Sequence, residues 1–278
     1  MPLDYQLNDG FVNTPLARNM VVFTDLDGTL LDHETYTHNA AEPALGRLRE
    51  LGVPLILASS KTAAEINPLR DQLGFSHCEA IVENGSGILE PRDHGNQSED
   101  TYQQLLQALN QIPEPLRQHY RGFADWSTEE VSARTGLPLA DAANAKIRRF
   151  SEPGLWQGSE QGRDEFVAAA QAAGLTVQQG GRFLTVSFGG NKAQRMMEIV
   201  KRHSKAGKPA FVVALGDAQN DVAMIEQADL GVIIPNPAHQ ELPRLDGEAS
   251  GRIIRAASAG PAGWNEVIMS LLETAAKK

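Results

Sequence analysis

Two aspartates stand two positions apart, directly after an apolar run near the start of the chain. In the string VVFTDLDGTLLD at 21–32, the run leads into Asp25 and Asp27. Side chains alternate along an extended segment, so both carboxylates face the same way while Leu26 packs inward. Two carboxylates this close repel each other unless a hard cation lies between them, and Mg²⁺ prefers oxygen ligands. The pair therefore indicates metal-assisted phosphoryl chemistry, and its plainest alternative is a polar turn after a strand.

A second acidic cluster follows another apolar run in the string ALGDAQNDVAMIEQAD. Asp217 stands at the end of that run, and Asn220 with Asp221 begins the next helical pattern. Asn220 alone would be a good helix N-cap. Acidic oxygens clustered at a strand end are nevertheless what a Mg²⁺ site needs. Because this cluster matches the first in its position at a strand tip, the two together favour a metal site over a turn.

Hydroxyl and ammonium groups stand at two further junctions. In ILASSKT, Ser59 is placed to donate to a phosphate oxygen, while Ser60 is equally explained as the N-cap of a helix starting near Thr62. Lys61 is either a further phosphate contact or a solvated charge. In FGGNKAQ, Lys192 stands where a helix begins. It is either a surface residue or a cation that would neutralise a nucleophilic aspartate and the phosphoryl group.

Alternating strands and helices must bring these residues together. Residues 20–88 alternate between apolar strands and amphipathic helices, and the pattern resumes after 189–190. Near-continuous apolar strands separated by helices predict a parallel sheet covered on both faces. Sites in such sheets form outside the carboxyl ends of the strands, where all four candidates stand. We expect strands at 20–25, 53–59, 80–84, 209–217, 230–235 and 252–256, and helices at 41–52, 62–73, 191–203, 220–227 and up to 276.

The middle of the chain has a different pattern and predicts an inserted α+β unit with an antiparallel sheet. Residues 91–101 are polar and turn-rich. We expect helices around 100–110, 128–135 and 162–173, and strands at 146–156, 175–179 and 182–188. The predicted organisation is an N-terminal extension at 1–18, a core formed by 19–87 with 189–278, and a cap at 88–188.

Taken in chain order, these motifs resemble those of the haloacid dehalogenase (HAD) superfamily. The matching residues are Asp25-Leu26-Asp27-Gly28-Thr29, Ser59, Lys192 and the segment 216–221. An insert between the second and third motifs resembles the Cof-like branch, which implies a Rossmann-like parallel-sheet α/β core with an inserted α+β cap. Three further features resemble the mannosyl-3-phosphoglycerate phosphatase family within it: SSKT, Glu83-Asn84-Gly85, and Ser151-Glu152-Pro153 with Trp156.

The resemblance implies a phosphatase that works through an aspartyl-phosphate. Asp25 would be the nucleophile, and Asp27 would protonate the leaving sugar oxygen and then activate water. Asp27 would give the metal only its backbone carbonyl, and Asp221 would support the metal through water. The implied Mg²⁺ ligands are Asp25, Asp27, Asp217 and Asp221. The implied phosphate-binding residues are Ser59, Lys192 and Asn220, of which the last would orient Asp27 or the phosphate.

We expect the cap to determine which substrate binds. The glycerate carboxylate of such a substrate would need a cation in the cap as its partner. Three arginines on expected strands are candidates, although each is also explained as the exposed face of a sheet. Ser151 and Glu152 would contact sugar hydroxyls or form a strand-ending turn, and Asn84 would form a hinge and also contact substrate. The candidate arginines are Arg148, Arg149 and Arg182.

The amino-acid composition limits the possible binding partners and the cellular compartment. A net charge of −10 argues against a nucleic-acid partner. Cys78 is the only cysteine, which excludes an internal disulfide and favours a reducing compartment with this residue as a small buried hydrophobe. The first residues lack the apolar stretch of a signal peptide, and no run is long enough for a membrane span. We expect a cytoplasmic protein whose partner is a small phosphorylated sugar-glycerate.

Rival functions share much of this machinery. A glucosyl-3-phosphoglycerate phosphatase or a broad-range sugar phosphatase would use the same catalytic residues. A phosphomutase would use the same nucleophile but must shield its phosphoenzyme from water, which the order of the cap does not favour. A non-catalytic sugar-phosphate-binding protein would have little use for Asp27.

Overall fold

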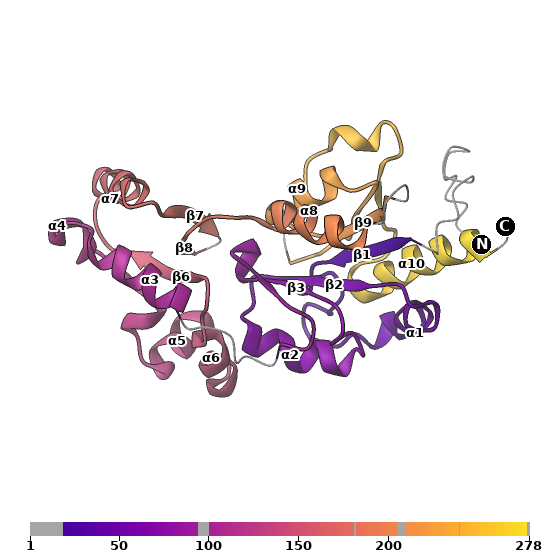
Figure 1. Cartoon of the computed structure of the whole chain (residues 1–278), viewed down its shortest axis with the longest axis horizontal. Helices are drawn as coiled ribbons and strands as arrows, with labels where there is room; N and C mark the ends of the chain where they lie inside the picture. The colour runs from indigo at the N-terminus through magenta and orange to yellow at the C-terminus, as the bar shows by residue number, and fades with distance from the viewer. Residues whose placement is uncertain (1–18, 94–99, 181, 205–208, 239, 277–278) are drawn as a thin grey trace.

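The computed structural model describes residues 19–93, 100–180, 182–204, 209–238 and 240–276, so the extension predicted for 1–18 lies outside it. Two sheets stand at opposite ends of an elongated molecule (Figure 1). Each sheet packs against its own cluster of buried apolar side chains. Within the described residues, no helix has the length and apolar character needed to cross a membrane.

The larger sheet has seven strands in the order β11-β10-β9-β1-β2-β3-β4. All neighbouring strands are parallel except β3 and β4, which are antiparallel. Every residue of β1, β2 and β10 is buried, as expected for strands covered on both faces. The predicted parallel sheet is therefore confirmed. Its strands are β1 (Met20–Thr24), β2 (Leu55–Ala58), β3 (Ala80–Val82), β4 (Gly87–Leu89), β9 (Phe211–Gly216), β10 (Leu230–Ile233) and β11 (Ile253–Arg255).

Helices cover both faces of this sheet, with α1 and α2 on one side and α8 and α9 on the other (Figure 1). The last helix, α10, packs on α1. The predicted stop at Gly52 is confirmed, because this residue takes the left-handed conformation (φ +64°) that glycine tolerates at a helix end. The helices are α1 (Glu42–Leu51), α2 (Ala63–Gln72), α8 (Lys192–His203), α9 (Val222–Gln227) and α10 (Gly260–Ala276).

The start of α2 differs from the prediction, because Thr62 rather than Ser60 is its N-cap. The Thr62 hydroxyl accepts from the backbone N–H of Glu65 at 3.3 Å, and the Glu65 carboxylate accepts from the backbone N–H of Thr62 at 2.8 Å. This reciprocal capping box needs Glu or Gln three residues after the cap, which Ser60 lacks. Ser60 therefore stays in the loop between strand and helix.

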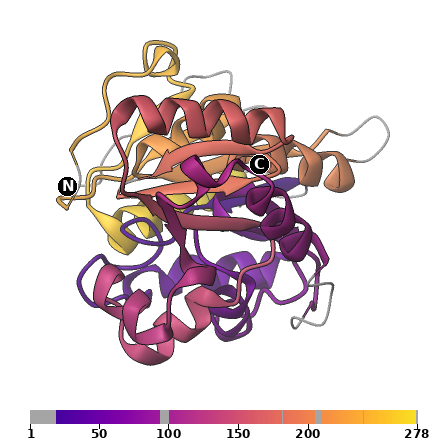
Figure 2. The same ribbon diagram turned by 90° about the vertical axis from the view of Figure 1, so that its left-hand side faces the viewer.

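The smaller sheet is antiparallel, in the order β5-β6-β8-β7. In the view of Figure 2, α7 runs above it and α5 and α6 lie below it. Apolar side chains of α3 and α7 pack on it around Tyr120 and Phe166. The strands are β5 (Tyr120–Gly122), β6 (Ser151–Trp156), β7 (Thr176–Gly180) and β8 (Phe183–Ser187). The helices are α3 (Asp100–Asn110), α4 (Glu114–Arg117), α5 (Thr128–Thr135), α6 (Leu139–Lys146) and α7 (Glu160–Ala172).

The strand predicted at 146–156 begins only at Ser151, because α6 continues through Lys146. Arg148 and Arg149 consequently lie in the connection before β6, and Arg182 lies in the turn between β7 and β8, so their predicted placement on strands is wrong. Alanine-rich residues 139–146 form a helix because alanine has the highest helix propensity.

Candidate active site

The carboxyl ends of the central strands place the predicted acidic residues side by side. Asp25 follows β1, and Asp217 follows β9, which pairs with β1 along its length. Asp221 comes from a short 3₁₀ turn (Gln219–Asp221) before α9. Carboxylate oxygens of Asp25, Asp217 and Asp221 all lie within 4.8 Å of one another, and all three residues are buried. The structure thus groups the carboxylates of three of the four predicted metal ligands. The fourth, Asp27, was predicted to bind the metal through its backbone carbonyl.

Lys192 lies inside this cluster, at the first turn of α8. Its Nζ is 2.6 Å from Asp25 Oδ1 and 2.7 Å from Asp221 Oδ1, and the side chain is only 1% exposed. Burial disfavours the ammonium, but the two carboxylates outweigh it and raise the pKa of Lys192, so the lysine stays charged. The alternative of a surface lysine is excluded by this burial.

Negative charge is in excess at this cluster, which holds three carboxylates against one ammonium. Burial raises the pKa of Asp25 to about 8, with a further contribution from Asp221 and against the effect of Lys192. A carboxylate in this position is therefore poorly stabilised by the protein alone. Buried, convergent carboxylate oxygens are the donor set that a hard divalent cation prefers, and its charge would balance the excess. The residues present fit such a cation.

Hydrogen bonds fix the orientation of Asp217. Its Oδ1 accepts from the Thr29 hydroxyl at 3.1 Å, and its Oδ2 accepts from Asn236 Nδ2 at 2.7 Å. Asn236 was not among the predicted site residues, although it follows β10 at the same edge of the sheet, where the strand-tip rule would have placed it. A Cβ on Gly28 would lie 2.0 Å from Asn236 Nδ2, so this glycine is needed for the close approach.

Asp27 lies at the mouth of the site with its two carboxylate oxygens in different surroundings. Oδ2 is 2.8 Å from Lys61 Nζ. Oδ1 is buried and has no hydrogen-bond partner among the described residues. Burial opposes the charge on Lys61, but the Asp27 carboxylate outweighs it and raises the pKa of this ammonium. A buried acceptor without a partner is uncommon in native proteins and suggests a catalytic role or a missing ligand.

Ser59 and Asn220 complete the predicted set. Ser59 is buried after β2, and its Oγ accepts from the backbone N–H of Lys61 at 3.2 Å. Asn220 is exposed and donates from Nδ2 to Asn84 Oδ1 at 3.1 Å, rather than to Asp27. Asn84 has a left-handed backbone (φ +57°), as does Glu83 (φ +50°). Such conformations cost about 1–3 kcal/mol each and cluster at functional sites.

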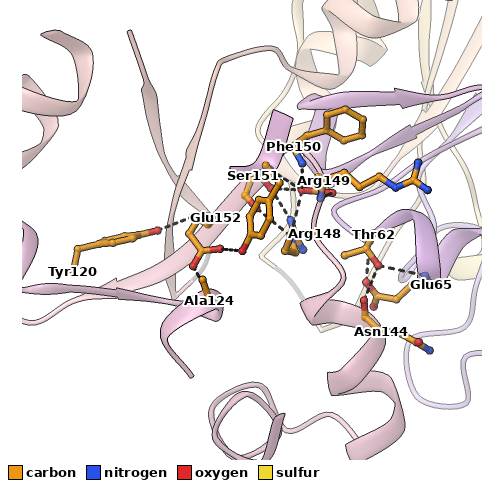
Figure 3. A network of polar contacts seen from close by, with 12 residues as sticks. Thr62, Glu65, Tyr120, Ala124, Asn144, Arg148, Arg149, Phe150, Ser151 and Glu152 are labelled. Atoms are coloured by element: carbon orange, nitrogen blue, oxygen red, sulfur yellow. Dashed lines mark hydrogen bonds and ion pairs between the residues drawn. The ribbon is translucent and has the colours of Figure 1, made fainter. Parts of the chain in front are cut away.

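Glu83 connects this site to the smaller sheet. Its carboxylate accepts from the backbone N–H of Arg149 at 2.8 Å, and from both the backbone N–H and the hydroxyl of Ser151 at 2.8 Å. Arg148 Nε lies 3.2 Å from the same carboxylate. Figure 3 shows Arg148, Arg149 and Ser151 gathered at this point, with Thr62 and Asn144 in a second contact beside it. The sequence did not predict this role for Glu83, because nothing in its local pattern indicates such distant partners.

The other cap candidates also have partners within the protein. Arg149 pairs with Asp93 at 3.1 Å, and the side chains of Arg148 and Arg149 are only 6% and 8% exposed, so the alternative that they form an exposed face is wrong. Glu152 accepts from the Tyr102 hydroxyl at 2.5 Å and from the backbone N–H of Ala124 at 2.8 Å (Figure 3). Burial raises the pKa of Glu152 to about 7. The exposed Arg182 donates to the backbone carbonyls of Arg134 and Thr135.

A family model for haloacid dehalogenase-like hydrolases matches residues 22–135 and 163–243. The chain belongs to the haloacid dehalogenase-like hydrolases. The predicted superfamily and the prediction of an enzyme are thereby confirmed.

Two relatives of this HAD hydrolase carry the same name, glucosyl-3-phosphoglycerate/mannosyl-3-phosphoglycerate phosphatase. The protein from Methanococcoides burtonii is 32% identical over 267 residues, and that from Persephonella marina is 32% identical over 271 residues. Each alignment covers 91% of this chain and 97% of the relative. The likeness therefore extends over both sheets.

Solved structures share the fold. A haloacid dehalogenase-like hydrolase from Bacteroides thetaiotaomicron superposes with a TM-score of 0.61 at 16% identity, covering 92% of this HAD hydrolase and 99% of that chain. The sucrose-phosphatase from Synechocystis, in complex with sucrose and phosphate, superposes with a TM-score of 0.56 at 18% identity, covering 91% and 98%. At these identities the likeness establishes the fold alone.

Proposed function

We propose that this chain is a Mg²⁺-dependent phosphomonoester hydrolase that acts through an aspartyl-phosphate and converts mannosyl-3-phosphoglycerate to mannosylglycerate. The observation that carries the proposal is the convergence of Asp25, Lys192 and the acidic pair Asp217 and Asp221 at the strand tips. The relatives named for this chemistry over nearly the whole chain support the choice of substrate.

The two aspartates of the opening motif have separate roles in this proposal. A carboxylate oxygen of Asp25 forms a bond to phosphorus while the bond from phosphorus to the glycerate oxygen breaks. In this mechanism Asp27 gives a proton to the departing oxygen, and we assign the transfer to its partner-free Oδ1. Asp27 then removes a proton from the water that attacks the aspartyl-phosphate, releasing phosphate and restoring both carboxyl groups.

Positive charge and hydrogen-bond donors supply the rest of the catalysis. The Lys192 ammonium and the Ser59 hydroxyl would hold the transferring phosphoryl oxygens, where preorganised donors contribute most of the rate. Asp25, Asp217, Asp221 and the backbone carbonyl of Asp27 would hold Mg²⁺. When bound, the ion supplies charge neutralisation at the phosphoryl oxygens. We also infer that residues 88–188 act as a cap over this site.

A second candidate substrate is the glucosyl epimer, because the names of both relatives include it. The two substrates differ at one sugar hydroxyl and would use every catalytic residue in the same way. A broad-range sugar phosphatase is a further alternative and has the same core chemistry.

Release of inorganic phosphate tests the proposal. The wild-type protein is assayed with mannosyl- and glucosyl-3-phosphoglycerate and with simple hexose phosphates, with Mg²⁺ and with excess chelator. The proposal predicts Mg²⁺-dependent release that is fastest with the mannosyl substrate, and no release after Asp25→Asn. Asp164→Asn, which changes an exposed carboxylate on α7, is the matched control and should retain activity. Faster release from hexose phosphates would overturn the substrate, and release that is indifferent to chelator would overturn the metal.

A further inference from the structure

A lysine in the loop between β2 and α2 stands directly beside Asp27. Lys61 Nζ lies 2.8 Å from Asp27 Oδ2 and 5.7 Å from the centroid of the Tyr36 ring. Hydrogen bonds hold the backbone N–H and the backbone carbonyl of Lys61. The N–H donates to Ser59 Oγ at 3.2 Å, and the carbonyl accepts from the backbone N–H of Glu83 at 2.9 Å. The Lys61 side chain is 21% exposed, so it is not fully enclosed by the protein.

If Asp27 protonates the leaving group as proposed, Lys61 lies on the leaving-group side of the site. Asp27 Oδ1 is buried and has no hydrogen-bond partner among the described residues, and in the proposed function it is the atom that gives its proton to the bridging oxygen. Lys61 contacts the other oxygen of the same carboxylate. In a 3-phosphoglycerate, two carbons separate the bridging oxygen from the carboxylate, so a substrate whose bridging oxygen binds at Asp27 would bring its carboxylate toward Lys61. An ammonium has three N–H donors, and Asp27 needs one of them.

Two of the three arginines that the sequence suggested for the substrate carboxylate are engaged in ion pairs elsewhere. Arg148 pairs with Glu83, and Arg149 pairs with Asp93. Each pair is largely buried, and breaking such a pair leaves an uncompensated charge, which costs about 3–5 kcal/mol. Using either arginine for substrate would require that loss, whereas Lys61 can keep its contact with Asp27.

Tyr36 supports the placement of Lys61. Its side chain is 57% exposed, and its backbone is left-handed (φ +54°), a conformation that is strained for a bulky residue. A cation over an aromatic ring is attracted by about 0.5–1 kcal/mol at an exposed site. The ring therefore helps to hold the ammonium at the mouth of the site.

We propose that Lys61 binds the carboxylate of the substrate's glycerate group and is a specificity-determining residue. The inference rests on the proposed function and deepens it, because it assigns recognition of the second anion to the larger sheet rather than to the cap. The substrate class that fits is a phosphomonoester with a carboxylate two carbons from its ester oxygen.

The test compares mannosyl-3-phosphoglycerate with its carboxamide, which has the same phosphate and sugar but no second charge. Phosphate release gives kcat/KM for both compounds in wild type, Lys61→Met and Lys61→Arg. A hydrogen bond to a charged group contributes about 10- to 100-fold, so the wild type should prefer the acid by that factor. Lys61→Met should reduce the preference to about 1- to 3-fold, and Lys61→Arg should retain most of it.

Using the ratio separates recognition from catalysis. Losing the partner of Asp27 in Lys61→Met slows both compounds alike and cancels in the ratio. Lys201→Met, which changes an exposed lysine in the last turn of α8, should leave the wild-type ratio unchanged. If Lys61→Met retains the preference, or if the wild type has none, the inference is overturned while the phosphatase proposal stands. If the wild type hydrolyses neither compound, the proposed substrate fails, and the inference fails with it.

Discussion

The two sheets use their buried charges in opposite ways. At the strand tips of the larger sheet, Asp25, Lys192, Asp217 and Asp221 form a cluster with an excess of negative charge. Around the smaller sheet, the buried charges are paired within the protein, as in the contacts of Arg148 with Glu83 and of Arg149 with Asp93. The first region therefore fits a divalent cation that would balance its excess charge, whereas the second has its buried charges already paired.

The largest expected effect comes from Asp25→Asn. The amide cannot form an acyl phosphate, so kcat should fall by about 10⁴-fold or more. Folding should be retained, because asparagine has the same shape and removes one negative charge from the excess. Phosphate release and far-UV circular dichroism measure the two outcomes. Substantial Mg²⁺-dependent activity in this variant would contradict the assignment of the nucleophile.

Lys192→Met should have the next largest effect. Removing a preorganised cation from the transferring phosphoryl group typically lowers kcat by about 10²–10³-fold. The repulsion between Asp25 and Asp221 would also increase, and addition of Mg²⁺ should raise the unfolding temperature of the variant more than that of the wild type. Lys201→Met serves as the control. If kcat is unchanged, Lys192 only balances charge in the fold.

Glu83→Gln tests the anchoring role of the cap contacts. Losing a charged acceptor for Arg148 and Ser151 should misplace the cap, and small misplacements reduce turnover by about 10-fold or more. The effect on kcat/KM should be larger for mannosyl-3-phosphoglycerate than for p-nitrophenyl phosphate, which needs little of the cap. Glu160→Gln, at an exposed site on α7, is the control. Equal losses on both substrates would show that Glu83 affects the core site directly.

Glu152 should affect stability with little effect on turnover. Its pKa is raised by burial from the usual 4.5 to about 7, so the folded protein holds a proton that the unfolded chain releases between these values. The free energy of unfolding should therefore decrease as pH rises through this window, by an amount on the order of 3 kcal/mol. In Glu152→Gln this decrease should be absent, so urea unfolding at pH 5 and pH 8 measures it. The same pH dependence in both proteins would contradict the raised pKa.

The sequence predicted the larger sheet and the grouping of acidic residues at its edge, because both depend on local signals. Apolar strands ending in Asp25, Ser59 and Asp217 fix which residues share the sheet edge, and a parallel sheet then brings them together. The family resemblance added roles for these residues, and these roles remain proposals.

Predictions for the smaller sheet were weaker, because its contacts are between residues far apart in the chain. Glu83 meets Ser151 across 68 positions, and no local pattern signals that contact. The helix at 139–146 ends at the residue where a strand was expected to begin, which moved Arg148 and Arg149 off the sheet. Asn236 had no predicted role for a different reason, since it follows Pro235 beyond the end of β10 and lies outside the four strand-tip motifs.

A covalent intermediate on Asp25 is the most direct test of the central claim. Wild-type protein is mixed with mannosyl-3-phosphoglycerate and Mg²⁺, quenched with acid within one turnover, reduced with borohydride and analysed by peptide mass spectrometry. Borohydride reduces an aspartyl-phosphate to homoserine, so the account predicts homoserine at position 25, unchanged Asp27, and no conversion when Mg²⁺ is omitted. Phosphate release within that turnover without homoserine at position 25, or with homoserine at position 27, would contradict it.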